Sequence, residues 1–328
     1  MYCTRKLTEQ VWWVGGSDRR LALFENLFPI TRGVSYNSYL ILDEQTAVVD
    51  TVDSSISRQF LENVLHTLDG RPLDYLVINH MEPDHCASIE TLLLRFPTLK
   101  LVGNAKTFAF MGQFYDFPLD GRTVTVKEGD TLSLGGHTLH FHMTPMVHWP
   151  EVMMTYESSE KLLFSADAFG TFGALDGKLF NDEVDFDRDW LDDARRYYTN
   201  IVGKYGTFVQ KLLKKLQTLD VKMICPLHGP VWRSNLEYFI EKHDKWSKYE
   251  PEEKGVLIAY ASMYGNTESA AQALACKLVE KGCPDVKVYD VSNTPVSYLI
   301  SDAFKYSNIV LASVTYNLPR RPRSPSLG

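Results

Sequence analysis

Three apolar segments far apart in the chain each lead directly into a polar residue that can bind a metal. "LDYLVINH" ends at His80, "KLLFSADAFG" delivers Asp167 and "VKMICPLHG" delivers His228. Short apolar runs bounded by polar residues are typical of buried strands. Because α/β folds place their chemistry in the loops at strand ends, the repeated pattern predicts an α/β protein with a metal site assembled from distant segments.

The first of these loops, "HMEPDH", holds four possible metal ligands within six residues. By itself such a hexapeptide also suits an ordinary solvated loop. The rest of the pattern favours a metal site, because "MVHWPE" adds one more histidine in the same kind of position. The candidate ligands are His80, Glu82, Asp84, His85, His148, Asp167 and His228.

The segments around these loops carry clear periodicities. Residues 35–50 predict two strands joined at "DEQ", and residues 123–145 predict antiparallel strands, because apolar and polar residues alternate there. Residues 54–68 predict an amphipathic helix with Ser54 or Ser55 as its N-cap. Long helical stretches are expected at 190–219 and 235–249.

A second α/β unit begins after a segment rich in proline and acidic residues. The loop "SMYGNT", residues 262–267, lies between a predicted buried strand and a predicted helix. In this arrangement backbone N–H groups and a helix N-terminus can hold a phosphate. The same residue types also form ordinary turns and helix caps. The position of the loop, after the first strand of a new unit, favours the phosphate site.

The whole pattern resembles the metallo-β-lactamase superfamily, and its acid-rich ligand set resembles the flavodiiron proteins. The resemblance extends from Met1 to about Asn317 and includes "GVSYNSYLI". It implies an αβ/βα sandwich followed by a flavodoxin-like, doubly wound parallel sheet. It also implies one iron held by His80, Glu82 and His148, a second held by Asp84, His85 and His228, and Asp167 as the bridge between them.

The second unit resembles flavodoxins, which implies an FMN site. "SVTYN", residues 313–317, corresponds to the flavin-contacting loop after the third strand. In the strand order 2-1-3-4-5, FMN lies at the switch point between strands 1 and 3. The implied FMN contacts are Ser262, Met263, Tyr264, Gly265, Asn266, Thr267, Ser313, Thr315, Tyr316 and Asn317.

The chemistry of the ligand set agrees with iron. Hydrolases of the superfamily mostly use zinc and have a histidine where this chain has Glu82. A carboxylate there hardens the site and adds negative charge, and zinc offers no redox chemistry. The resemblance therefore implies reduction of O2 to water or of NO to N2O, with electrons arriving through FMN from rubredoxin or another reductase. It also implies a head-to-tail homodimer, or a dimer of such dimers, in which the flavin of one subunit serves the irons of the other.

The end of the chain departs from this pattern. Strands 4 and 5 of a flavodoxin-like unit are missing, and "LPRRPRSPSLG" has no apolar periodicity. Two interpretations remain open: a natural basic tail, or a chain that ends early, which we favour. We expect a diiron domain at 1–250, a linker at 251–254, a truncated FMN domain at 255–317 and an irregular tail at 318–328.

Two other functions compete with this interpretation. A metal-dependent hydrolase of the superfamily would act through a metal-activated hydroxide, although Glu82 and the appended unit argue against it. A redox-inactive fragment would fold without turning over substrate. A net charge of -7 gives no support to nucleic-acid binding. With no apolar run long enough to span a bilayer and no signal sequence, a cytoplasmic location is expected.

The remaining histidines and the cysteines are assigned ordinary roles. His137, His140 and His142 have no acidic neighbour in sequence, so a half-exposed strand face is the favoured interpretation. His66 and His243 are expected to face solvent or a groove. The five cysteines lack CxxC spacing and are expected to be reduced and mostly buried, Cys86 among them.

Overall fold

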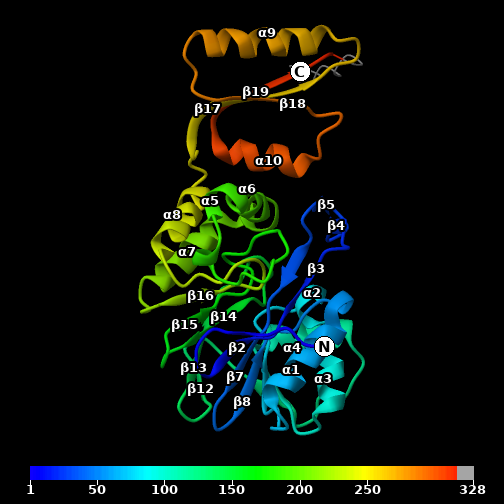
Figure 1. The fold of residues 1–328 in the computed structure, drawn as a ribbon, viewed down its shortest axis with the longest axis vertical. Coiled ribbons are helices and arrows are strands. Elements are labelled where there is room, and N and C mark those ends of the chain that lie inside the picture. Colours follow the sequence, from blue (N-terminus) through cyan, green and yellow to red (C-terminus); the bar gives the residue numbers. More distant parts are fainter. Residues whose placement is uncertain (316–328) are drawn as a thin grey trace, which may run out of the picture. The chain divides into compact units, whose positions relative to one another are not determined.

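The structure, a computed structural model, describes residues 1–315 (Figure 1). It divides into two compact units, with the boundary after Glu250. β17 (Glu253–Ala261) begins inside the segment 251–254 that was predicted to be a linker. The predicted tail, 318–328, lies outside the described residues.

The first unit contains two large sheets, and the larger one has seven strands. β8, β9 and β10 run parallel in it and are joined by helical crossovers, as expected for an α/β protein. Every side chain of β8 is buried, which explains its continuous apolar run. In spatial order the strands are β1 (Arg5–Lys6), β2 (Val11–Trp13), β7 (Tyr39–Leu42), β8 (Thr46–Val49), β9 (Tyr75–Val77), β10 (Lys100–Gly103) and β11 (Thr123–Thr125).

The second sheet of this unit has five strands. Their spatial order is β12 (Thr131–Ser133), β13 (Thr138–Met143), β14 (Met153–Glu157), β15 (Leu162–Phe164) and β16 (Met223–Cys225). The antiparallel prediction for 123–145 is correct for β12 and β13. It is wrong for β11, which pairs in parallel with β10 of the other sheet, because alternation defines a strand without defining its partner.

Two short ribbons complete the strands of this unit. β3 (Gly16–Asp18) pairs with β6 (Val34–Tyr36), and β4 (Leu23–Phe24) pairs with β5 (Phe28–Pro29). The second ribbon projects from the chain as a tight hairpin near the upper edge of this unit in Figure 1. Its turn residue Glu25 has a positive φ of 49°.

The predicted helix at 54–68 is present with a different cap. α1 (Ser57–Leu68) buries Phe60, Val64 and Leu68 on one stripe, and a 3-10 turn at Ser54–Ile56 precedes it. Neither predicted serine caps it. The carboxylate of Asp53 instead accepts the N–H of Ser55, because its extended backbone places the side chain over the first turn.

The helical stretch predicted at 190–219 is interrupted. α6 (Leu191–Tyr197) passes into a π-helical turn at Tyr198–Val202 and a 3-10 turn at Gly203–Tyr205 before α7 (Gly206–Leu216) begins. The second predicted stretch forms α8 (Leu236–Ser247). The remaining helices of this unit are α2 (Pro83–Cys86), α3 (Ile89–Arg95), α4 (Ala105–Phe114) and α5 (Phe186–Asp189).

The helices lie outside the two sheets. α1, α3 and α4 gather on one side of the unit, and α7 and α8 gather on the other (Figure 1). This arrangement confirms the predicted αβ/βα sandwich of metallo-β-lactamase type. Among residues 1–315, none of the helices combines the length and apolar character needed to cross a membrane.

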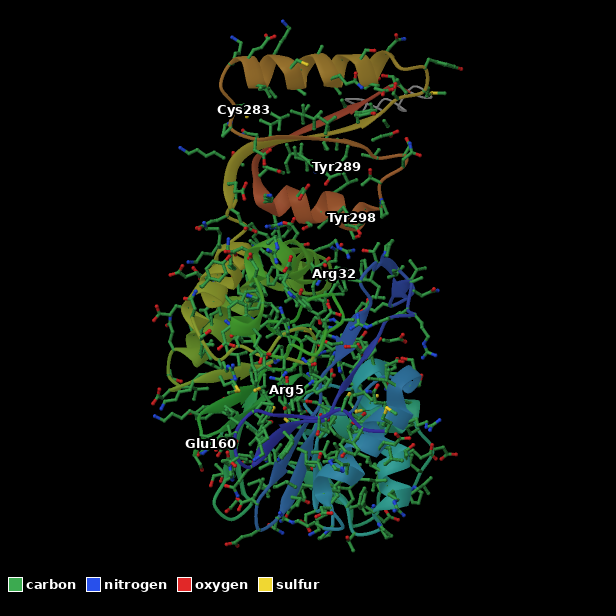
Figure 2. The ribbon with its side chains drawn as sticks, viewed as in Figure 1. Arg5, Arg32, Glu160, Cys283, Tyr289 and Tyr298 are labelled. Carbon is green, nitrogen blue, oxygen red and sulfur yellow. The ribbon has the colours of Figure 1, made fainter. Side chains whose placement is uncertain are left out.

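The second unit has a three-stranded parallel sheet in the order β18 (Val286–Asp290), β17, β19 (Tyr306–Ser313). This is the 2-1-3 order expected of a doubly wound sheet. α9 (Asn266–Glu280) and α10 (Val296–Lys305) cover its opposite faces (Figure 1). The side chain of Tyr289 points toward α10 (Figure 2), where its hydroxyl donates to Asp302 at 2.8 Å.

Candidate metal centre

The loop after β9 presents four of the predicted ligands. Glu82 stands at the N-cap position of α2, and Asp84 and His85 follow within that one-turn helix. Proline at the first helical position favours this tight start, because its φ is already helical. Upstream, the buried carboxylate of Asp50 accepts the N–H groups of Asn79 and His80, which fixes the end of the strand.

The other three predicted ligands come from three separate segments. His148 precedes β14, while Asp167 and His228 follow β15 and β16, whose parallel pairing brings the ends of the two strands together. The backbone around them is strained. Met146 and Ala166, close to His148 and Asp167, have positive φ values of 67° and 51°. Such conformations typically cost about 1–3 kcal/mol and concentrate at functional sites.

The seven side chains meet in two adjoining groups. The first consists of His80, Glu82, His148 and Asp167, whose ligand atoms lie within 4.8 Å of one another. Oε2 of Glu82 lies 3.2 Å from Nε2 of His80 and 3.0 Å from Nε2 of His148. Oδ2 of Asp167 approaches the same two nitrogens at 3.2 and 3.1 Å.

The second group consists of Asp84, His85 and His228. Oδ2 of Asp84 lies 3.3 Å from Nε2 of His85 and 3.4 Å from Nε2 of His228. Oδ1 of Asp167, its other carboxylate oxygen, lies 3.3 and 3.6 Å from these nitrogens. Asp167 therefore directs one oxygen into each group, as a bridging carboxylate would.

Hydrogen bonds on the outer side of two ligand histidines fix which ring nitrogen carries the hydrogen. Nδ1 of His80 lies 2.7 Å from a carboxylate oxygen of Glu151, and Nδ1 of His228 lies 2.7 Å from the carbonyl oxygen of Ser35. Both Nδ1 atoms must therefore carry the hydrogen in the neutral ring, so both Nε2 atoms are acceptors. Nε2 of His228 is 3.1 Å from Nε2 of His85. Because Nδ1 of His85 has no hydrogen-bond partner, only the Nε2 lone pairs of His80 and His228 are fixed in this way, and both are available to a cation.

Unpartnered polar atoms point to cations. Both carboxylate oxygens of Asp84 and Oδ1 of Asp167 are buried without a hydrogen-bond donor. Isolated buried charges are strongly unfavourable, so this arrangement fits metal coordination. Four imidazoles and three carboxylates in two groups, with Asp167 facing both, fit two cations.

The electrostatics agree with positive charge at the centre. Burial alone would lower the pKa of His80, but the carboxylates of Asp167, Glu151 and Glu82 outweigh it and raise that pKa well above the ordinary value. Burial would likewise raise the pKa of Glu82. Hydrogen bonds from His148 and His80 instead hold it well below its usual range.

An aromatic wall encloses the second group. The rings of Phe24, Tyr36 and Tyr197 lie 5.4, 5.6 and 5.4 Å from the ring of His228. The hydroxyl of Tyr197 is buried without a hydrogen-bond partner. Burial, followed by the negative charge of Asp167, raises its pKa well above the ordinary value, so this hydroxyl stays protonated.

Two acidic residues near the ligands were not predicted from the sequence. Glu151 is 1% exposed, and its carboxylate contacts Nδ1 of His80. It lies three residues after His148 in the "MVHWPE" segment, and this spacing could have indicated a role in supporting the metal ligands. Glu25, in the turn of the β4–β5 hairpin, approaches Glu82. Loss of hydration and then the charge of Glu82 raise the pKa of Glu25 to about 8. Its sequence neighbours carry no corresponding signal.

The predicted FMN contacts lie in the second unit. Residues 262–267 connect β17 to α9, and the hydroxyl of Ser262 accepts the N–H of Gly265 at 3.0 Å. Gly265 has a positive φ of 85°, which a glycine adopts without strain, and no atom would meet a Cβ there within 4 Å. The loop thus leaves room in front of the helix N-terminus, and Met263 and Tyr264 are exposed.

The second predicted flavin segment follows from β19. Ser313 ends that strand, and Thr315 is the last described residue. Both come at the carboxyl end of β19, which pairs in parallel with β17, so they share an edge of the sheet with the 262–267 loop. Tyr316 and Asn317 lie outside the described residues.

The expectations for two of the other histidines, His137 and His243, were wrong, because both are buried, whereas His140 and His142 are half-buried as expected. His243 is buried, because four aromatic rings surround it, those of Phe169, Tyr198, Phe239 and Trp246. His66 is exposed as expected and stacks on Tyr2. Cys86 is buried, and burial raises its pKa to about 12. All five cysteines are free, but Cys3 and Cys276 are exposed, so they are not mostly buried.

His137 also has acidic partners that its sequence neighbourhood hides. Its Nδ1 lies 3.1 Å from Asp43, and its Nε2 lies 3.5 Å from Glu160. With Glu157 these residues form a third group of possible ligand atoms. The oxygens of Glu157, however, accept the N–H groups of Ser159 and Glu160 at 2.7 Å each, so this group is satisfied as a hydrogen-bonded network.

The fold and the paired ligand groups define a metallo-β-lactamase-like protein with a dinuclear metal centre. Residues 34–229 match the family model described as ODP family beta lactamase. The structure is similar to the rubredoxin oxygen:oxidoreductase of Desulfovibrio gigas, with a TM-score of 0.88, 30% identity, and coverage of 97% of this chain and 80% of that one. The chain belongs to the flavodiiron protein family.

Two further relatives agree. The flavodiiron protein of Giardia intestinalis has a TM-score of 0.90 and 28% identity, and the match covers 97% of this chain and 76% of that chain. The anaerobic nitric oxide reductase flavorubredoxin of Klebsiella pneumoniae is 34% identical over 323 residues, which are 97% of this chain and 66% of the relative. The chain thus spans about two thirds of the flavorubredoxin's length.

Proposed function

We propose that this protein is a flavodiiron oxidoreductase that reduces O2 to water or NO to N2O at two non-haem irons. The observation that carries the proposal is the two-sided position of Asp167, with Oδ2 among His80 and His148 and Oδ1 beside His85 and His228. One iron would be held by His80, Glu82 and His148, with Asp84, His85 and His228 holding the other. The relatives named for rubredoxin-linked oxygen reduction and for nitric oxide reduction support this assignment.

Iron, rather than zinc, fits the donor set. Glu82 contributes a carboxylate between two imidazoles, which gives the first group two oxygen donors when Asp167 is included. Hard carboxylate donors favour iron relative to softer sets, and both irons would supply redox chemistry by cycling between the +2 and +3 states. Zinc could not do so.

The surrounding residues would orient and isolate this chemistry. Glu151 and the Ser35 carbonyl hold His80 and His228 with Nε2 directed inward, as partners behind metal-binding histidines commonly do. The Phe24, Tyr36 and Tyr197 rings limit the access of water to the second group. Tyr197 retains a proton on its hydroxyl oxygen and can donate a hydrogen bond into the site.

Electron delivery completes the proposal. The 262–267 loop and the end of β19 would bind FMN at the switch point of the second sheet. Rubredoxin or another reductase would reduce the flavin, and two copies would pair head to tail so that the flavin of one reaches the irons of the other. Two irons and a two-electron flavin together can supply the four electrons that O2 requires. A cytoplasmic location is part of this proposal.

The test begins with anaerobic purification of the full chain and measurement of bound iron and FMN. We expect about two irons per chain, FMN near stoichiometric amounts, and consumption of NO or O2 with a reduced rubredoxin as donor. Two zincs with hydrolysis of an ester or thioester would instead establish the hydrolase. Two irons without flavin, and without turnover even when electrons come from a chemical reductant, would establish a redox-inactive protein.

A further inference from the structure

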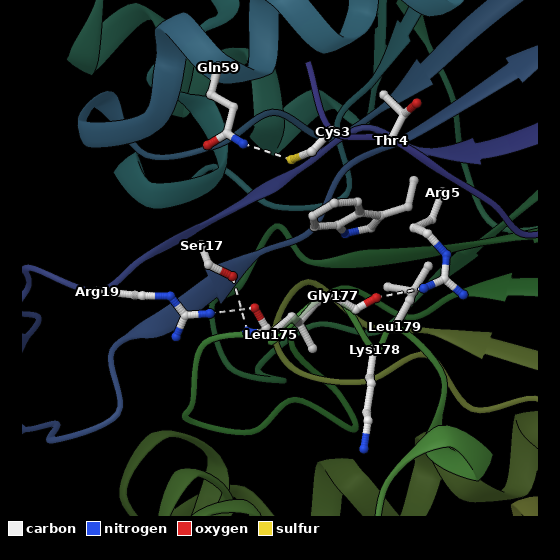
Figure 3. A pocket seen from close by; sticks show the side chains of 11 residues that line it. Cys3, Thr4, Arg5, Ser17, Arg19, Gln59, Leu175, Gly177, Lys178 and Leu179 are labelled. Carbon is white, nitrogen blue, oxygen red and sulfur yellow. Dashed lines mark hydrogen bonds between the residues drawn. The ribbon is translucent and has the colours of Figure 1, made fainter. Parts of the chain in front are cut away.

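A cavity in the first unit is lined by residues outside the metal-ligand set. It has a volume of about 320 Å³, which is within the range of small-molecule sites. The polypeptide contributes its N-terminal segment, β2, β3, α1 and the loop 175–179 to the lining (Figure 3). We call it the Arg19 pocket and define it by Arg5, Trp13, Arg19, Leu175 and Leu179.

Two arginines fix the floor of the Arg19 pocket. Nη2 of Arg19 donates to the carbonyl oxygen of Leu175 at 2.7 Å, and Nη1 of Arg5 donates to the carbonyl oxygen of Gly177 at 2.5 Å. Figure 3 shows the two guanidinium groups approaching the loop from opposite sides. Ser17 also accepts the N–H of Leu175 at 3.0 Å. The cations are therefore held in place before any ligand arrives, which lowers the entropy cost of binding.

The lining is positively charged. It includes Arg5, Arg19 and Lys178 but contains no aspartate or glutamate. The carboxylates that pair with the arginines, Asp176 and Glu183, stand outside the lining. The Arg19–Asp176 pair is exposed, with side-chain exposures of 53% and 73%, so it is weak and an arriving anion can displace it.

Arg19 has donors to offer. Both hydrogen bonds that Arg19 donates to the described residues use Nη2, so its Nε and Nη1 are not engaged in a hydrogen bond with them. Each planar fork that a guanidinium offers to the two oxygens of a carboxylate includes Nη2, and both Nη2 hydrogens of Arg19 are already donated, so a ligand carboxylate must take the place of Asp176 to bind in this way. The geometry therefore suits a carboxylate better than a cation or a neutral polar group.

The apolar part of the lining is fixed. Trp13 is 7% exposed, and its Nε1 donates to Asn37 at 2.9 Å, so the ring cannot rotate without losing that hydrogen bond. Leu175 and Leu179 are 7% and 1% exposed. We propose that the Arg19 pocket binds a small, flat carboxylate, with its charge at Arg19 and its apolar body against Trp13 and Leu179.

Benzoate is the probe that tests this, with benzyl alcohol as the uncharged analogue and inorganic phosphate as the anion without an apolar body. Titration calorimetry of the purified full chain should give a dissociation constant of about 1 mM or tighter for benzoate. Both comparison compounds should bind at least about fivefold more weakly. Raising the salt from about 50 to about 500 mM should weaken benzoate binding, because part of the site is exposed.

Arg19→Gln should weaken benzoate binding by about fivefold or more, since the charged fork is lost. Arg188→Gln is the matched control, because Arg188 is also an exposed arginine paired with an aspartate. The Arg188→Gln protein should bind benzoate as tightly as the wild type does. Benzoate bound at the metal centre would be insensitive to Arg19→Gln. The proposal is overturned if Arg19→Gln binds benzoate as tightly as the wild type does, or if benzyl alcohol binds as tightly as benzoate. It is also overturned if benzoate binding does not change with salt, or if benzoate does not bind at about 10 mM.

Discussion

Glu151 lies 2.7 Å from Nδ1 of His80, with the carboxylate and the imidazole both inaccessible to solvent. The same oxygen accepts the N–H of Met81 at 3.0 Å. These two contacts fix the ring so that Nε2 points at Glu82 and Asp167. A residue that ligates no metal thus sets the direction of one that does.

Removing this support should weaken metal binding. Glu151→Leu leaves Nδ1–H of His80 without an acceptor, and losses of such partners typically reduce metal affinity by about 10- to 100-fold. Glu151→Gln keeps an acceptor oxygen and should lose less. Iron affinity is measured by competition with a chelator. Glu157→Gln, at an equally buried glutamate away from the ligands, is the control. Equal affinities for Glu151→Leu and the wild type would contradict the assigned role.

Replacing Glu82 by histidine should change which metal is bound. Glu82→His converts the first group toward the softer donor set of the zinc hydrolases, so the purified protein should contain more zinc and less iron. Elemental analysis of protein from identically supplemented cultures gives the ratio. Glu90→His, at an exposed glutamate on α3, should leave the ratio unchanged. Unaltered iron content in Glu82→His would show that the carboxylate does not select the metal.

Burial of His243 should make stability depend on pH. Burial lowers the pKa of His243 from its ordinary 6.5 to about 4, so between these values the unfolded chain binds a proton that the folded chain does not. Stability should therefore fall as the pH drops from 6.5 to 4, by about 3 kcal/mol from this residue. His243→Phe should remove that part of the decline.

The comparison is made by chemical denaturation of metal-free wild type and His243→Phe at several pH values. Because the ligand histidines titrate in both proteins, their contributions cancel in the difference. As the pH falls below 6.5, the free energy of unfolding of His243→Phe should rise relative to that of the wild type. Above pH 6.5 the difference between the two free energies should be constant. Parallel stability curves across this range would mean that His243 is accessible to protons in the folded state.

The cap of the first helix provides a test of local structure. Asp53→Ala should lower the free energy of unfolding by about 1 kcal/mol, because the N–H of Ser55 loses its acceptor. Ser54→Ala should change it by less than about 0.5 kcal/mol, since Ser54 is exposed and its side chain does not cap the helix. Urea denaturation measures the free energy of unfolding of both variants. If Ser54→Ala lowers it more than Asp53→Ala does, the serine and not the aspartate caps the helix.

Sequence alone predicts the strands that lead to His80, Asp167 and His228, and it supplies the chemical identity of the ligands. Apolar runs and ligand types are local properties, so they can be identified without knowing which segments meet. The same is true of the 2-1-3 unit, whose strands, loop and helix follow one another directly in the chain. The expected αβ/βα sandwich followed from these local features together with the family resemblance.

Three-dimensional packing establishes which distant groups face each other. It placed the oxygens of Asp167 toward two separate ligand groups, brought Asp43 to His137 across 94 residues, and paired β11 with the other sheet. It also buried His243, although α8 has a polar average composition. Periodicity encodes which face of an element is buried. The partner on that face is chosen by the packing of the whole chain, where the free energies of many contacts are satisfied together.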